Sequence, residues 1–209
     1  MLSTLSGLAQ LALEFGTDKY PNCRVYERYF EEFKERSTNL FEIGVGGYDK
    51  PEEGGGSLRM WKKYFKYGKV YALDFYDKSS HAENGITIYR GSQDDEVLLN
   101  KIADDMGRLD IILDDGSHIC EHVIKSFEIL FPRLNEGGIY IVEDIGTSYW
   151  PSCGGSESLD DPNTSMAYFK RIADGINSFA FKHKYEPTYA DQHAAFVHFY
   201  PNFVVIQKK

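Results

Sequence analysis

The sequence lacks any run of about 20 apolar residues, the length that a transmembrane helix requires, so we expect no membrane span. It also lacks clustered basic residues: 23 Lys and Arg stand against 32 Asp and Glu, which gives a net charge of −9. We therefore expect no nucleic-acid partner, because phosphate binding needs grouped basic side chains. The start of the chain shows neither the basic region nor the cleavage site of a signal peptide.

Cysteines are few and widely separated. The three residues Cys23, Cys120 and Cys153 form no CxxC pair, and nothing in the chain matches the ligand spacing of a zinc site. An odd number of scattered cysteines is typical of a protein kept in a reducing compartment. We therefore predict a cytoplasmic location.

The apolar pattern predicts one α/β domain over residues 1–209. Residues 1–37 are expected to be helical, and the apolar face that includes Leu2, Leu5 and Leu8 favours self-association into a homo-oligomer. Short apolar runs then alternate with helical stretches, which is typical of a parallel sheet with right-handed crossovers. Strands are expected at 39–45, 69–75, 85–91, 109–114 and 137–144, and helices at 57–65, 94–106, 120–130 and 165–179.

Two segments after the last of these strands carry signals of their own. Residues 147–165 are rich in Gly and Pro and are expected to form a long loop. Long loops at strand ends are often lids or binding loops, so we assign this segment as the active-site loop. Residues 194–209 contain two apolar runs around Tyr-Pro-Asn, a turn signal that predicts an antiparallel hairpin at the sheet edge.

A glycine-rich turn follows the first expected strand. In FEIGVGGYDKPEEGGGSLRMW, Gly44 and Gly46 permit a tight turn and close approach of the backbone to a ligand, and the helix start near Ser57 offers free N–H groups. No third glycine follows at the dinucleotide spacing, which counts against a nicotinamide-dependent oxidoreductase. The next strand ends at Asp74, a residue type that can hold the hydroxyl pair of a ribose. The turn and this acid together predict a nucleoside site.

Two later apolar runs end abruptly in acidic residues, and an imidazole follows the first of them. The residues are Asp114, Asp115 and His118 in LDIILDDGSHICEH, and Glu143 and Asp144 in GGIYIVEDIGTSYW. Ligands bind beyond the carboxyl ends of parallel strands, and like charges gathered there require a cation or a specific reaction. Carboxylates are ligands that a hard cation such as Mg²⁺ prefers. The simpler alternatives are that the acids cap a helix or pair with basic residues, and that the histidine only begins a helix.

The order of these features resembles that of class I S-adenosylmethionine-dependent methyltransferases: E-x-G-x-G after the first strand, then an acid ending the second strand and another ending the fourth. More narrowly, the chain resembles the metal-dependent sugar O-methyltransferases of macrolide biosynthesis. The matching segments, from about residue 39 to the end, are EIGVGGY, GGGSLRMW, DFYDK, GSQDD, LDIILDDGSHICEHVIKSF, VEDIGTSYW and HFYPNFVVIQK. The resemblance implies a Rossmann-like fold, with a mostly parallel sheet, helices on both faces and a C-terminal antiparallel hairpin.

The resemblance also implies roles for individual residues. Asp115, Glu143 and Asp144 are implied to hold Mg²⁺, and His118 is implied to be the catalytic base. The residues implied to contact S-adenosylmethionine are Glu42, Gly44, Gly46, Asp74, Ser92, Gln93 and Asp114. We also expect contacts from Ser57, at the helix start, and from Thr17. The macrolide enzymes carry a longer N-terminal region that helps assembly, whereas this chain has only a short helical portion there. The number of subunits therefore stays open.

These observations predict a magnesium-dependent O-methyltransferase that acts on a sugar hydroxyl of a natural product or a surface polysaccharide precursor. A cation held by carboxylates can orient neighbouring hydroxyls and lower the pKa of the one that reacts. A histidine, with an ordinary pKa of about 6.5, can then accept the proton. Two alternatives remain: a methyltransferase for a non-sugar acceptor, such as a diol or a phosphorylated group, and a non-catalytic nucleoside-binding protein.

Overall fold

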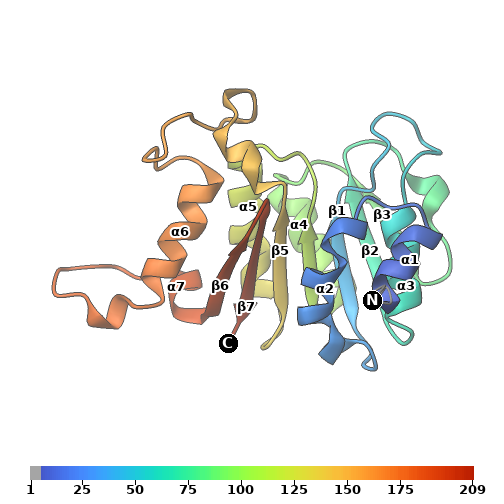
Figure 1. Cartoon of the computed structure of the whole chain (residues 1–209), viewed down its shortest axis with the longest axis horizontal. Helices are drawn as coiled ribbons and strands as arrows, with labels where there is room; N and C mark the ends of the chain where they lie inside the picture. Colours follow the sequence, from blue (N-terminus) through green and yellow to red (C-terminus); the bar gives the residue numbers. More distant parts are fainter. Residues whose placement is uncertain (1–5) are drawn as a thin grey trace, which may run out of the picture. The chain divides into compact units, whose positions relative to one another are not determined.

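The computed structural model describes residues 6–209, which group into two compact units, 6–91 and 92–209 (Figure 1). The expected apolar positions Leu2 and Leu5 lie outside the described residues. A single domain over the whole chain stays a prediction. Within the part of the chain that the structure covers, no helix combines the length and the apolar character needed to cross a membrane.

The first unit combines a three-stranded parallel sheet with short helices. Strand β2 pairs in parallel with β1 on one side and with β3 on the other, so the order within the unit is β3-β2-β1. The elements are α1 (Gly7–Glu14), η1 (Tyr20–Asn22), α2 (Cys23–Phe30), η2 (Glu31–Phe33), β1 (Asn39–Ile43), α3 (Gly56–Tyr64), β2 (Lys69–Asp74), η3 (Ser79–His81) and β3 (Ile86–Arg90).

The N-terminal helix corrects one expectation. Helix α1 begins where Ser6 Oγ accepts a hydrogen bond from the Ala9 N–H at 3.2 Å. Its apolar residues Leu8 and Ala12 are fully buried within the chain, so these two side chains are not available for self-association. An amphipathic pattern indicates that the apolar face of a helix is buried. It does not indicate whether the same chain or another copy of the chain covers that face. The homo-oligomer stays a prediction, but the buried residues of α1 do not support it.

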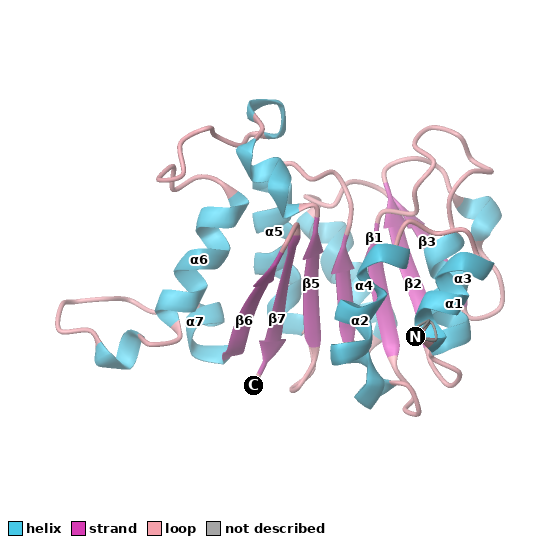
Figure 2. Cartoon of the chain, in the orientation of Figure 1, coloured by secondary structure: helices cyan, strands magenta, loops and turns pink. Residues whose placement is uncertain are grey.

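The second unit combines parallel and antiparallel strands. Strand β4 pairs in parallel with β5, whereas β7 pairs antiparallel with both β5 and β6, giving the order β4-β5-β7-β6 (Figure 2). The predicted C-terminal hairpin is therefore confirmed. The elements are α4 (Glu96–Met106), β4 (Ile111–Asp114), α5 (Cys120–Leu130), η4 (Phe131–Arg133), β5 (Ile139–Glu143), η5 (Ile145–Tyr149), η6 (Pro151–Cys153), α6 (Ser165–Gly175), η7 (Ser178–Ala180), α7 (Tyr189–His193), β6 (Ala194–Tyr200) and β7 (Phe203–Lys208).

For the strands and helices predicted after residue 37, the boundaries differ from the observed ones by at most two residues, except that the helix expected to reach 179 ends at Gly175. The helical portion expected over 1–37 is interrupted between Glu14 and Tyr20 and ends at Phe33. The segment 147–165 also differs from expectation, because η6 and most of η5 lie within it. It folds back on itself: the Ser156 N–H donates to the Ser148 carbonyl at 3.0 Å, and a Cβ on Gly155 would collide with that carbonyl. The segment is thus compact for much of its length. Its role as an active-site loop stays a prediction.

The core of the second unit is centred on Phe127 of α5. Its ring lies 4.8 Å from that of Phe131 and 5.1 Å from that of Phe169, and the side chain is 1% exposed.

We expect Phe127→Ala to lower the free energy of unfolding by about 3–5 kcal/mol, because it leaves a cavity among these rings. Urea unfolding followed by circular dichroism measures this. Phe179→Ala is the control, since that ring is 87% exposed, and an equal loss in both variants would contradict the assignment.

Candidate active site

The acidic residues that follow β4 and β5 lie at one edge of the second unit's sheet. The parallel register pairs Asp114 with Val142, so the carboxyl ends of the two strands are adjacent. All residues of both strands are buried, as expected for the centre of a parallel sheet. Asp115, His118 and Asp144 each offer one ligand atom here, and these atoms lie within 4.8 Å of one another. This trio is called the metal cluster below.

Two members of the metal cluster have a left-handed backbone. The φ angle is 57° at His118 and 51° at Asp144, a conformation that costs a non-glycine residue on the order of 1–3 kcal/mol. Thr147 Oγ1 lies 3.0 Å from the His118 carbonyl and 2.9 Å from the Asp144 carbonyl, so its hydroxyl links the two loops. The structure holds both residues in these conformations, which favours a functional reason for them.

A residue of the C-terminal hairpin completes the support of Asp144. The side chain of Asn202, in the turn between β6 and β7, donates from Nδ2 to Asp144 Oδ1 and accepts the Gly146 N–H at 2.8 Å. On the other side, His118 Nε2 lies 3.7 Å from Asp144 Oδ2. One carboxylate oxygen therefore faces an amide and the other faces the imidazole. Sequence reasoning included Thr147 only as the first residue of the predicted active-site loop, and it missed Asn202 as part of this site.

Glu143 is placed differently from its neighbour. It ends β5 opposite Phe203 of β7 and is 6% exposed, and its carboxylate is not among the ligand atoms of the metal cluster. Successive residues of a strand face opposite sides, whereas Asp144 has already left the strand with a positive φ. The structure therefore gathers Asp115 and Asp144 with His118, and the ligand role of Glu143 stays a prediction.

Gln93 and Asp114 form a buried network with Ser126 of α5. Asp114 Oδ2 accepts the Ser126 hydroxyl at 2.7 Å, and Asp114 Oδ1 accepts Gln93 Nε2 at 3.0 Å. Burial raises the pKa of the Asp114 carboxyl to about 6, and the hydrogen bonds from Ser126 and Gln93 partly oppose this rise. Nearby, Ser92 donates to the Asp94 carboxylate, and this bond holds the pKa of Asp94 below its ordinary value.

The first unit holds the other residues expected at a cofactor, beginning with Glu42. This residue is 1% exposed, and its Oε2 accepts the Ser57 hydroxyl and the Trp61 indole N–H, each at 3.1 Å. Lys19 Nζ lies 3.8 Å from the other carboxylate oxygen. Thr17 Oγ1 accepts the Lys19 N–H at 3.4 Å and donates to Asp18 at 3.3 Å. Glu42 therefore joins β1, α3 and the segment before α2.

Asp74 fixes the glycine-rich turn after β1. Its Oδ2 accepts the Val45 N–H at 2.9 Å and its Oδ1 accepts the Tyr76 N–H at 2.8 Å. Gly44 and Gly46 have φ angles of 99° and 84°, so the predicted need for glycine in this turn is confirmed. Contact of these residues with a cofactor stays a prediction.

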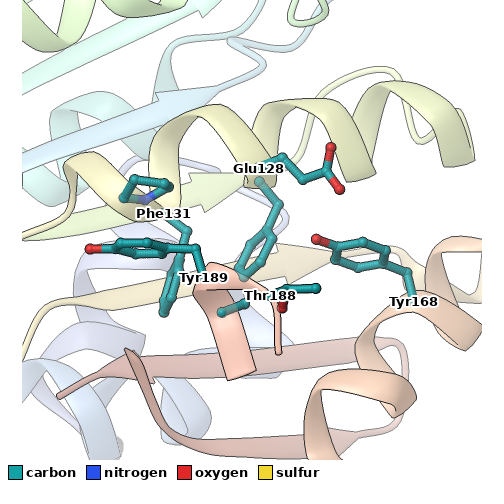
Figure 3. Close-up of a pocket in the computed structure, with 8 residues that line it drawn as sticks. Glu128, Phe131, Tyr168, Thr188 and Tyr189 are labelled. Carbon is teal, nitrogen blue, oxygen red and sulfur yellow. The ribbon is translucent and has the colours of Figure 1, made fainter. Parts of the chain in front are cut away.

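A separate cavity of about 220 Å³ lies near the C-terminal end of α5, in the second unit (Figure 3). It is lined by Phe127, Glu128, Phe131, Pro132, Tyr168, Thr188, Tyr189 and Ala190, and Figure 3 shows the rings of Phe131, Tyr168 and Tyr189 around it. No residue of the metal cluster lines it, since His118 precedes the opposite end of the same helix. This cavity is therefore not the candidate active site.

No protein-family model matches the chain. Two similar proteins are sugar O-methyltransferases by name. The 8-demethyl-8-alpha-L-rhamnosyl tetracenomycin-C 2'-O-methyltransferase of Streptomyces olivaceus is 45% identical over 97% of this chain and 55% of its own length. The mycinamicin VI 2''-O-methyltransferase of Micromonospora griseorubida is 41% identical over 88% of this chain and 47% of its own. The chain thus spans about half the length of the curated relatives it matches.

A solved structure shows the same fold. MycE methyltransferase in complex with Mg, SAH and mycinamycin VI superposes on 99% of this chain with a TM-score of 0.91 and 38% sequence identity. The match covers 54% of that protein. The expected Rossmann-like class I fold, mostly parallel with an antiparallel C-terminal hairpin, is confirmed.

Proposed function

The chain belongs by sequence and fold to the sugar O-methyltransferase family that includes mycinamicin VI 2''-O-methyltransferase, and from this premise we propose that it is an S-adenosylmethionine- and magnesium-dependent O-methyltransferase. The acceptor is a hydroxyl of a sugar carried by a natural product. The relatives are named for tetracenomycin and mycinamicin acceptors, which favours such sugars over polysaccharide precursors. We place the reaction in the cytoplasm, since Cys23, Cys120 and Cys153 are free thiols.

The observation that carries this proposal is the metal cluster. Asp115 and Asp144 offer carboxylate oxygens at one point, and oxygen ligands fit Mg²⁺. Glu143, adjacent in sequence to Asp144, is proposed as a third carboxylate ligand. When bound, the cation supplies positive charge that lowers the pKa of a coordinated hydroxyl. Asp115 and Asp144 would hold this cation beside His118, where an acceptor hydroxyl could be deprotonated. This would matter because a neutral sugar hydroxyl is a poor nucleophile.

His118 accepts the proton of that hydroxyl. Its Nε2 lies within 3.7 Å of Asp144 Oδ2, so a carboxylate is present to stabilise the imidazolium that forms. The methyl group of S-adenosylmethionine is already activated as part of a sulfonium, so the remaining task is alignment. Gly44, Gly46 and Asp74 are proposed to hold this donor, because their turn leaves the backbone open to close approach. Ser92 is proposed to contact it as well.

Removal of divalent metal is expected to abolish methyl transfer and leave donor binding intact. The measurement is formation of S-adenosylhomocysteine with a panel of rhamnosylated and other glycosylated natural products, with magnesium, with EDTA, and with EDTA followed by excess magnesium. Calorimetry with S-adenosylhomocysteine in EDTA serves as the control for folding. Full activity in EDTA would contradict the metal role. Binding of NAD with no binding of S-adenosylhomocysteine would reject the methyltransferase assignment altogether.

A further inference from the structure

We propose that Gln93 is a positioning residue for the metal cluster rather than a contact of the methyl donor. The inference rests on the proposed function, and it concerns how the second unit holds its acidic loop in place. Gln93 lies between β3 and α4 and is 5% exposed. Its side-chain amide bonds to the two residues that directly precede members of the metal cluster.

The two ends of the amide have different partners. Gln93 Oε1 accepts the Ser117 N–H at 2.6 Å, and Gln93 Nε2 donates to Asp114 Oδ1 at 3.0 Å. Ser117 precedes His118 in the chain, and Asp114 precedes Asp115. One planar group therefore fixes both ends of the four-residue stretch 114–117, which contains Asp115 and directly precedes His118. The amide supplies an acceptor at one of these points and a donor at the other.

The loop needs such support because its own backbone is strained. His118 has a φ of 57°, and the short stretch between β4 and α5 has no regular secondary structure. Ser117 Oγ accepts the Ile119 N–H at 3.3 Å and lies 3.1 Å from His122 Nδ1, which ties the far side of the turn to α5. The bond from the Ser117 N–H to Gln93 Oε1 fixes the same residue to the segment that precedes α4.

The side-chain amide of Gln93 also helps to hold the Asp114 carboxylate in its buried position. Its carboxylate, 1% exposed, receives Gln93 Nε2 at one oxygen and the Ser126 hydroxyl at the other. Gln93 Nε2 also lies 3.4 Å from Ser126 Oγ, so its amide hydrogens are directed into this network. Because the side chain is buried with partners at both ends, it has little left to offer a cofactor. Groups that orient metal ligands from behind typically change metal affinity by about 10- to 100-fold when removed.

The test compares metal binding with donor binding in Gln93→Leu. Mn²⁺ affinity is measured by electron paramagnetic resonance titration, and S-adenosylhomocysteine affinity by calorimetry in metal-free buffer. We expect Mn²⁺ affinity to fall by about 10- to 100-fold and the affinity for S-adenosylhomocysteine to stay within about twofold of wild type. Gln192→Leu is the matched control, since that side chain is exposed and only donates to the Pro187 carbonyl at 3.4 Å.

Gln93→Glu keeps the size of the side chain and the acceptor for Ser117, but it replaces the donor to Asp114 with a second carboxylate. Because two buried carboxylates repel each other, we expect Mn²⁺ affinity to fall in this variant too. If Gln93→Leu fails to fold, the Mn²⁺ affinity of Gln93→Glu is measured in its place. Unchanged Mn²⁺ affinity in a folded variant would overturn the inference, and so would an equal loss of both ligands. Wild-type protein that binds S-adenosylhomocysteine but no Mn²⁺ would instead reject the proposed metal centre, and the positioning role with it.

Discussion

His118→Ala is expected to lower the rate of methyl transfer by about 100- to 10,000-fold, the usual contribution of a general base. His118 is proposed to accept the proton of the acceptor hydroxyl, and its Nε2 lies 3.7 Å from the Asp144 carboxylate. The affinity for S-adenosylmethionine should stay within about twofold, because a group that acts on the acceptor proton adds little to donor binding. Single-turnover assays at saturating donor and magnesium measure the rate, and calorimetry measures the affinity.

Two further measurements separate the possible roles of His118. His183→Ala is the control, because that imidazole is exposed and stacks only on Phe181. Since His118 also offers a ligand atom to the metal cluster, Mn²⁺ affinity is titrated in the same variant. Nearly unchanged Mn²⁺ affinity with a collapsed rate supports the base role. A parallel loss of both would make His118 a ligand instead, and retained turnover would remove it from the mechanism.

The sequence made part of this site predictable because parallel strands align their carboxyl ends. Asp115 and Asp144 follow two buried strands, so the apolar pattern alone predicts that they approach each other. His118 comes with them, since only two residues separate it from Asp115. Glu143 shows the limit of this reasoning. A pair of adjacent acids looks equivalent in sequence, yet Glu143 is still in the strand and Asp144 is beyond it.

The residues that support the site could not be predicted in this way. Thr147 lies 29 residues from His118 in sequence, and Asn202 lies 58 residues from Asp144. Their contacts depend on left-handed backbone at His118 and Asp144, which is rare for residues other than glycine and gives no periodic signal. Tyr-Pro-Asn identified the hairpin turn correctly, but a turn signal does not say what the Asn side chain will touch.

The buried glutamine gives a second example of the same limit. The resemblance, through the segment GSQDD, implies that Gln93 contacts the cofactor. Only the coordinates show that its amide faces Asp114 and the Ser117 N–H. Local sequence identifies that a polar side chain is needed at a strand end. It does not identify which groups that side chain will bond, because this depends on how the rest of the chain folds around it.

Asp144→Asn is expected to weaken Mn²⁺ binding by more than the roughly 10- to 100-fold that loss of a supporting residue costs, because it removes a charged ligand. The substitution keeps an oxygen at Oδ1, so the bond from Asn202 can survive and the loop can stay in place. A loss therefore reports the missing charge rather than a collapsed loop. Asp94→Asn is the matched control, since its carboxylate pairs with His122 and lies outside the metal cluster.

The rate in Asp144→Asn should fall together with metal affinity and rise again as magnesium is increased. Such recovery follows if the carboxylate acts by holding the cation, because mass action then compensates for a weaker site. Circular dichroism and calorimetry with S-adenosylhomocysteine verify that the variant is folded. Turnover in this variant that equals wild type and persists in EDTA would show that Asp144 holds no metal. The strained backbone at Asp144 and its bond from Asn202 would then need another function.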